Sequence, residues 1–186
     1  MIGYAITGSF CTVSRSLASL ASLRDGGADI LPIMSECAYS TDTRFAAAAD
    51  VRARLAELTG REIIHTVRDA EPLGPATPLE ALVIAPCTGN TLAKLASGIT
   101  DTAVTMAAKA HLRCDRPLII ALASNDAMSQ NLQNIARLLT RQSVYFVPLR
   151  QDDPTGKPHS LVADMSLVPA ALTAALRGEQ LRPLFI

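Results

Sequence analysis

Four short segments of the chain are rich in small hydroxyl and amide residues. They are residues 7–12, 35–43, 86–90 and 124–128, and each comes before an expected helix. Free N–H groups and the positive end of the helix dipole attract anions at such positions. Hydroxyl groups add hydrogen-bond donors, and small side chains let a flat ring approach the backbone. The four segments together therefore favour binding of a phosphorylated, planar cofactor.

The residues expected to contact this cofactor come from all four segments. They are Gly8, Ser9, Ser40, Thr41, Pro86, Thr88, Gly89, Asn90, Ser124 and Asn125. For any one segment alone, helix capping is the more common reason for Ser, Thr or Asn at a helix start. The chain contains neither G-x-G-x-x-G after its first strand nor G-x-x-x-x-G-K-[ST]. A dinucleotide fingerprint and a P-loop are therefore not supported.

Other chemically capable residues are scattered. The three histidines, His65, His111 and His159, have no carboxylate or cysteine partner at a telling spacing, so no general acid or base is assigned and no metal site is expected. Cys87 precedes a helix start, which can lower a thiol pKa, but a buried, inert cysteine is the simpler expectation. The side chains of Arg44, Lys109 and Arg113 can bind carboxylates. For each one alone, a solvated helix charge is the ordinary explanation.

Strands and helices alternate along the chain, and these elements must position the four segments. Strands are expected at 2–6, 29–34, 62–66, 81–85, 118–123 and 144–147, and helices at 12–23, 43–58, 90–98, 101–113, 127–141 and 161–177. Asn90 and Asp101 are the expected caps of two of these helices. Residues 69–79 contain three prolines and form the clearest loop. The uniformly apolar strands 81–85 and 118–123 are typical of a parallel sheet covered on both faces. We predict one doubly wound, Rossmann-like α/β domain over residues 1–186, with three layers and a mostly parallel sheet.

Composition excludes several classes of function. Lys+Arg and Asp+Glu are equal at 17 each, so no overall field attracts nucleic acid or an anionic membrane. No apolar run approaches the roughly 18 residues of a membrane span. The four cysteines form no C-x-x-C pair, which favours a reducing cytoplasm. The N-terminal segment has the pattern of a first strand rather than that of a signal peptide.

Residues 85–104, APCTGNTLAKLASGITDTAV, resemble the FMN-binding signature of the flavin-containing cysteine decarboxylase superfamily. That signature reads A-P-A-[ST]-A-N-T, followed by a helix and a G-I-x-D-like turn. The matching positions are Ala85, Pro86, Thr88, Asn90, Thr91, Gly98, Ile99 and Asp101. The Thr-Gly-Ser segment at residues 7–9 fits the same superfamily. The resemblance implies a flavoprotein fold with FMN as the cofactor.

The resemblance narrows to the branch formed by the B subunits of dipicolinate synthase. It includes residues 7–12, 40–45, 70–75, 85–90, 106–113, 124–128, 145–165 and 178–183 and extends from about residue 2 to residue 183. Two departures from the decarboxylases stand out. Their catalytic histidine falls in the neighbourhood of residues 71–75 here, and residues 123–126 replace their P-x-M-N substrate motif. Both departures argue against decarboxylation, and a flavin prenyltransferase is also disfavoured.

This branch implies a sporulation function in the cytoplasm of the mother cell. The chain is expected to act with the A subunit of dipicolinate synthase, which carries NADP, and to form homo-oligomers. Together the two proteins would convert a cyclic dicarboxylate of the lysine pathway, dihydrodipicolinate or its hydrated tetrahydro form, to dipicolinate. Arg44, Lys109 and Arg113 would pair with its carboxylates. Two alternatives stay open: a non-catalytic partner with a vestigial flavin pocket, and an independent FMN-dependent cysteine-type decarboxylase.

Overall fold

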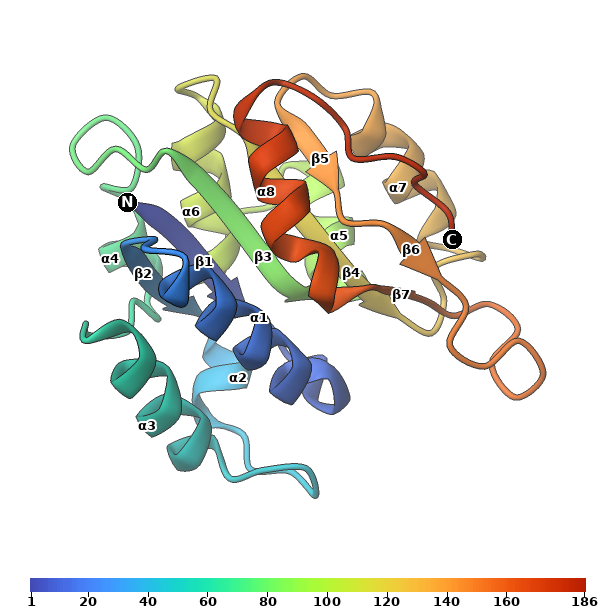
Figure 1. The fold of residues 1–186 in the computed structure, drawn as a ribbon, viewed down its shortest axis with the longest axis horizontal. Helices are drawn as coiled ribbons and strands as arrows, with labels where there is room; N and C mark the ends of the chain where they lie inside the picture. Colours follow the sequence, from blue (N-terminus) through green and yellow to red (C-terminus); the bar gives the residue numbers. More distant parts are fainter.

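A seven-stranded sheet forms the centre of the computed structural model, which describes all residues, 1–186. The strand order is β2-β1-β3-β4-β7-β6, with β5 beside the first half of β4. The parallel strands are β1 (Ile2–Ile6), β2 (Ile30–Met34), β3 (Ala81–Cys87), β4 (Leu118–Ser124) and β5 (Val144–Phe146). Helices cover both faces of this sheet (Figure 1). The predicted doubly wound, mostly parallel class is confirmed.

The core follows from the apolar runs of the central strands. Every residue of β1 and β3 is buried, and β4 is buried up to Ser124. α1 (Val13–Asp25) and α8 (Val168–Leu176) pack on one face. α5 (Gly89–Ser97), α6 (Ala103–Leu112) and α7 (Leu132–Leu139) cover the other. No helix is both long and apolar enough to cross a membrane.

Threonines, rather than the predicted residues, cap the two helices after β3. Thr88 Oγ1 accepts a hydrogen bond from Thr91 N (3.1 Å) and caps α5, where Asn90 was the expected cap. Thr102 caps α6 and forms a capping box with Thr105, where Asp101 was expected. Asp101 instead accepts a bond from Lys94 Nζ (2.8 Å). A capping hydroxyl must precede the first turn, and only the threonines occupy that position.

The C-terminal third differs most from the prediction. Residues 161–177 do not form one helix; they form β7 (Leu161–Ala163), the 3-10 turn η2 (Met165–Leu167) and then α8. β7 pairs antiparallel with the end of β4 and with β6 (Leu149–Arg150). The helical region starts only after Asp164, whose carboxylate accepts a hydrogen bond from Ser166 N (3.0 Å). Pro169 stands in the first turn of α8, where its missing N–H is tolerated.

Smaller differences also have local causes. The segment after β2 contains a short helix, α2 (Glu36–Ser40), and α3 (Ala48–Thr59) starts at residue 48 rather than 43 because Asp42 accepts a bond from Ala48 N (2.8 Å). α7 is shorter than the predicted 127–141 because turns fill the residues before it. Residues 62–66 form a single bridge, Ile33–Ile64, rather than a strand. The predicted loop begins with the end of α4 (Val67–Ala70), and η1 (Phe10–Thr12) precedes α1.

His111 is buried in α6 and gives the fold a pH dependence. Its Nε2 lies 2.9 Å from Pro117 O, and its Nδ1 has no hydrogen-bond partner. Burial lowers the pKa of this imidazole. As the pH falls below about 6.5, the pKa of histidine in the unfolded chain, His111 binds a proton more readily in the unfolded chain than in the folded one. The free energy of unfolding therefore falls by up to about 1.4 kcal/mol per pH unit. Above that pH, His111 contributes no pH dependence.

His111→Gln is therefore expected to flatten this dependence while keeping a donor for the carbonyl of Pro117. Urea unfolding of both proteins at pH 7.5 and 5.5 measures the effect. The wild type should lose more stability than the variant on acidification, by up to about 1.4 kcal/mol. Parallel losses in both proteins would contradict the assignment.

Candidate functional site

Thr7 links the loops that follow β1 and β3 by hydrogen bonds. Its Oγ1 donates to Pro86 O (2.7 Å) and accepts from Thr88 N (2.9 Å), while its own N–H donates to Pro86 O (3.2 Å). The side chain is fully buried, so these bonds form out of contact with water. Two of the predicted cofactor segments are thereby held side by side at the carboxyl end of the parallel strands, where ligands bind in open α/β sheets.

Several hydrogen-bond donors are free at this edge. Leu92 N donates to Thr88 O (2.9 Å), so the N–H groups of Gly89 and Asn90 precede the first bond of α5. The N–H of Gly8 donates to no oxygen of the chain. The Asn90 and Asn125 side chains are exposed and make no hydrogen bond within the chain. These groups can all donate to a phosphate or carbonyl oxygen.

The predicted hydroxyl groups are more occupied than these amides. Thr88 Oγ1 is engaged in capping, and it also donates to Thr91 Oγ1 (3.0 Å). Ser124 Oγ donates to Asp126 Oδ1 (2.5 Å) and Ser40 Oγ donates to Glu36 O (2.8 Å). Ser9 Oγ accepts from Thr12 Oγ1 (3.1 Å) and keeps its own hydrogen for a ligand. For Thr88, the capping explanation is what the structure shows.

Asp126 is a site residue that sequence reasoning missed. Its Oδ1 accepts bonds from Ser124 Oγ (2.5 Å) and Asn131 Nδ2 (2.9 Å), whereas Oδ2 has no partner. The Ser124 hydrogen bond is the main cause that holds the pKa of this carboxyl below its usual range. The carboxylate lies against the start of α5, because a Cβ on Gly89 would be 2.9 Å from Oδ1. A negative charge there disfavours an anion at the start of α5.

An apolar cleft adjoins the Gly8 segment. It measures about 20 Å³ and is lined by residues that include Ile6, Phe10, Met34 and Phe45. Phe45 is exposed on the 41–47 loop, and the guanidinium carbon of Arg44 lies 4.9 Å from its ring centroid. This volume is far below the roughly 300 Å³ or more of an enclosing ligand pocket. The free donors and this apolar surface fit a flavin that lies across an open edge, not one enclosed by a single chain.

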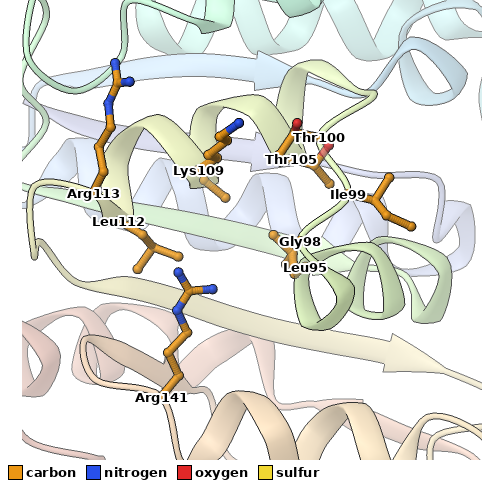
Figure 2. Close-up of a pocket in the computed structure, with 10 residues that line it drawn as sticks. Leu95, Gly98, Ile99, Thr100, Thr105, Lys109, Leu112, Arg113 and Arg141 are labelled. Carbon is orange, nitrogen blue, oxygen red and sulfur yellow. The ribbon is translucent and has the colours of Figure 1, made fainter.

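The three predicted carboxylate-binding cations do not converge. Arg44 lies on the 41–47 loop, whereas Lys109 and Arg113 line a cavity of about 270 Å³ between α5, α6 and α7 (Figure 2). Arg141, which follows α7, lines the same cavity and was missed because it lies 28 positions after Arg113 in the sequence. The structure thus describes two separate regions, the carboxyl edge and this cationic groove.

Cys87 and His65, the other candidates from the sequence, pack against neighbouring residues of the fold. Cys87 is fully buried, and burial raises the pKa of its thiol, so the expected inert cysteine is confirmed. His65 stacks on Tyr39 with ring centroids 3.8 Å apart, and Arg52 lies over the same Tyr39 ring. Cys37 Sγ would lie 3.5 Å from a Cβ placed on Gly8.

Comparison with known proteins adds the family to this geometry. The family model described as Flavoprotein matches residues 1–170. The B subunit of dipicolinate synthase from Bacillus subtilis (strain 168) is 42% identical over 185 residues, covering 100% of this chain and 92% of that protein. The chain belongs to the flavoprotein family, among the dipicolinate synthase B subunits. The predicted resemblance is therefore confirmed.

Two crystal structures resemble the fold of this chain. That of the dipicolinate synthase B subunit from Bacillus halodurans matches with a TM-score of 0.92 and 40% identity, covering 100% of this chain and 95% of the other. The FMN-dependent cysteine decarboxylase SpaF matches with a TM-score of 0.71 and 22% identity over 95% of each chain. At that identity the likeness to SpaF concerns the fold alone. The decarboxylase fold thus extends to this family.

Proposed function

We propose that the chain is the B subunit of a dipicolinate synthase. It acts with the nicotinamide-binding A subunit to convert dihydrodipicolinate, or its hydrated tetrahydro form, to dipicolinate. The observation that carries this proposal is the similarity to dipicolinate synthase B subunits over the whole chain, at 42% and 40% identity. The matched length covers both the carboxyl edge and the cationic groove, which supports the proposal.

The reaction removes one hydride and one proton from the ring. The hydride passes to the nicotinamide held by the partner protein, the proton passes to a base or water, and the ring becomes aromatic. When the substrate is the hydrated tetrahydro form, one water molecule leaves first. A flavin, when bound, supplies a flat ring capable of hydride chemistry.

The residues at the edge hold and orient these groups. The N–H groups of Gly8, Gly89 and Asn90 bind flavin oxygens, and Ser9 and Thr41 add hydroxyl donors. Pro86 and Thr88 shape the wall, while Ser124 positions Asp126 and Asn125 borders the opening. Arg44, whose guanidinium lies over Phe45 of the apolar cleft, pairs with a substrate carboxylate.

A non-catalytic partner protein is the second candidate function. The internal engagement of Thr88 and Ser124, together with the Asp126 carboxylate at α5, favours this candidate. Under this alternative the edge keeps the architecture of a flavin site, and the chain docks on the nicotinamide-binding protein without contributing to the chemistry. The two candidates differ in whether changes at the edge alter turnover.

The two purified proteins test the proposal directly. Conversion of the cyclic dicarboxylate with NADP is measured from the appearance of reduced nicotinamide, using the nicotinamide-binding partner on its own, this chain on its own and the two together. We expect turnover only from the pair. Turnover by the nicotinamide-binding partner on its own at the full rate would contradict the proposal.

Titration with FMN separates the two candidates. Asn90→Ala is expected to weaken FMN binding about tenfold, the usual effect of losing a hydrogen bond to a charged or strongly polar group. The same variant should lower turnover of the pair, whereas Gln133→Ala, an exposed change on α7, should alter neither. Absence of FMN binding, with turnover unchanged in Asn90→Ala, would instead establish the non-catalytic partner.

A further inference from the structure

The cationic groove exists because α5 is short. α5 packs against both α6 and α7, but it ends at Ser97, and Gly98 turns the chain away. Beyond that end, no helix fills the space between α6 and α7. The resulting cavity of about 270 Å³ is lined by Leu95 and the 98–100 turn on one side, by α6, and by Arg141 after α7. Figure 2 shows Arg141 reaching from the α7 side toward Leu112, while the side chains of Lys109 and Arg113 extend from α6 away from Arg141 in this view.

The groove is positively charged and contains no acidic lining residue. Lys109, Arg113 and Arg141 all line it, and among them only Arg113 has a carboxylate neighbour, Glu71 Oε1 at the long distance of 3.9 Å. All three side chains are exposed enough to move. None of the three is held in a short ion pair, so each side chain can turn toward an anion in the groove.

The negative ends of the three helix dipoles offset only part of this positive charge. Lys109 lies in the last turn of α6, and cations are commonly favourable near a helix C-terminus. Each helix end, however, carries only about half an elementary charge. The ends of α5, α6 and α7 together offset about half of three full positive charges, so the groove keeps a net positive field.

The shape and floor of the groove select the kind of anion. Leu95, Ala108 and Leu112 provide an apolar surface, and Thr100 adds a hydroxyl beside it. A cavity of about 270 Å³ lies near the lower end of small-molecule pockets, roughly 300–1,000 Å³. An apolar floor between cationic walls suits a small ring with carboxylates at its margin, and it suits inorganic phosphate poorly because phosphate has no apolar face.

We propose that this groove is a second binding site, for a small ring-shaped dicarboxylate of the product class. One carboxylate pairs with Arg141 and the other with Lys109 or Arg113, while the ring lies on Leu95 and Leu112. The choice of ligand rests on the proposed function. The cations of the groove lie away from the carboxyl edge: α6 begins at that edge, where Ala103 N donates to Glu36 Oε1 (3.1 Å), and Lys109 and Arg113 lie about 9 and 15 Å further along its axis. A ligand held by these cations therefore binds apart from the proposed site of the chemistry.

Calorimetric titration of this chain with pyridine-2,6-dicarboxylate tests the site without any need for turnover. We expect Arg141→Gln and Lys109→Gln each to weaken binding about tenfold or more, because each loses a charge-assisted hydrogen bond. Arg137→Gln is the matched control, since Arg137 is exposed on α7 and does not line the groove. Pyridine-2-carboxylate, with one carboxylate fewer, should also bind about tenfold more weakly.

The outcomes distinguish this site from the proposed function. Binding that depends on Arg141 and Lys109 supports the groove even if the two proteins together show no conversion, in which case the proposed function alone fails. If the pair converts the substrate but both groove variants bind the dicarboxylate as tightly as the wild type, the proposed binding site in the groove is wrong. Equal competition by inorganic phosphate also overturns it, because the site would then recognise charge without the ring. Far-ultraviolet circular dichroism of each variant verifies that the fold is intact.

Discussion

Replacing Gly89 with alanine is expected to disrupt the carboxyl edge and to lower the free energy of unfolding by about 1–3 kcal/mol, as overpacking does. A Cβ at this position would lie 2.3 Å from Ser124 Oγ and 2.6 Å from Asn131 Nδ2. Asn131 is only 5% exposed, and it holds Asp126 while its own Oδ1 accepts a bond from Asn134 Nδ2 (2.9 Å). The cluster has little room to yield, so the methyl group must displace either Ser124 or the start of α5.

Urea unfolding and FMN titration measure the two consequences. Asn90→Ala is the matched variant, because Asn90 is exposed and has no partner within the chain. Its stability should change by less than about 0.5 kcal/mol, the range of ordinary surface substitutions, although it weakens FMN binding. Gly89→Ala should lose both stability and FMN affinity. Wild-type stability in Gly89→Ala would show that the Ser124, Asp126 and Asn131 cluster is not packed as described.

The central sheet was predictable because its signals are local. The segments 81–85 and 118–123 are uninterrupted apolar runs, and such runs belong to parallel strands covered on both faces. The helix ends near Gly60 and Gly98 were also predictable, since a glycine can end a helix in the left-handed conformation that both residues adopt. Each of these signals lies within a few residues of the element that it specifies.

The antiparallel extension was not predictable for the opposite reason. β6 has two residues and β7 has three, too few for a strand period to appear. β7 exists because Val162 and Leu161 pair with Ala123 and Ser124, about 40 residues away in the sequence. The apolar residues of 161–177 also fit a helical pattern, which is why one helix was expected there.

The candidate site shows the same division. Its four segments were located because the ends of parallel strands meet at one edge of the sheet. The role of each side chain was less accessible: Thr88 is occupied by capping, and Asp126 matters through its proximity to Gly89, which no spacing reveals. Arg141 joins Lys109 and Arg113 only through the packing of α7 beside α5. Residue types thus indicated the chemistry, and long-range packing decided which residues share a site.

Replacing Gly74 with alanine is expected to have the largest effect on stability, a loss of about 3 kcal/mol or more. A Cβ on Gly74 would lie 2.2 Å from Ala110 O and 2.9 Å from Ala110 C. These are backbone atoms of α6, and α6 is itself packed on β3 and β4, so the clash cannot be relieved by rotating a side chain. The 71–78 segment must therefore separate from α6, and Leu73, which is 2% exposed, would lose its burial.

Gly8→Ala is the control for this substitution, because its Cβ would meet Cys37 Sγ at 3.5 Å, an ordinary contact distance. Its stability should stay within about 0.5 kcal/mol of the wild type. Urea unfolding followed by circular dichroism compares the two, and failure of Gly74→Ala to fold, beside a folded Gly8→Ala, agrees with the expectation. Equal stabilities would mean that the proline-rich segment does not rest on α6. In that case Glu71, which neighbours this segment, would not be held near α6. Its carboxylate, the one ion-pair partner of Arg113 in the cationic groove, would then be free to move away.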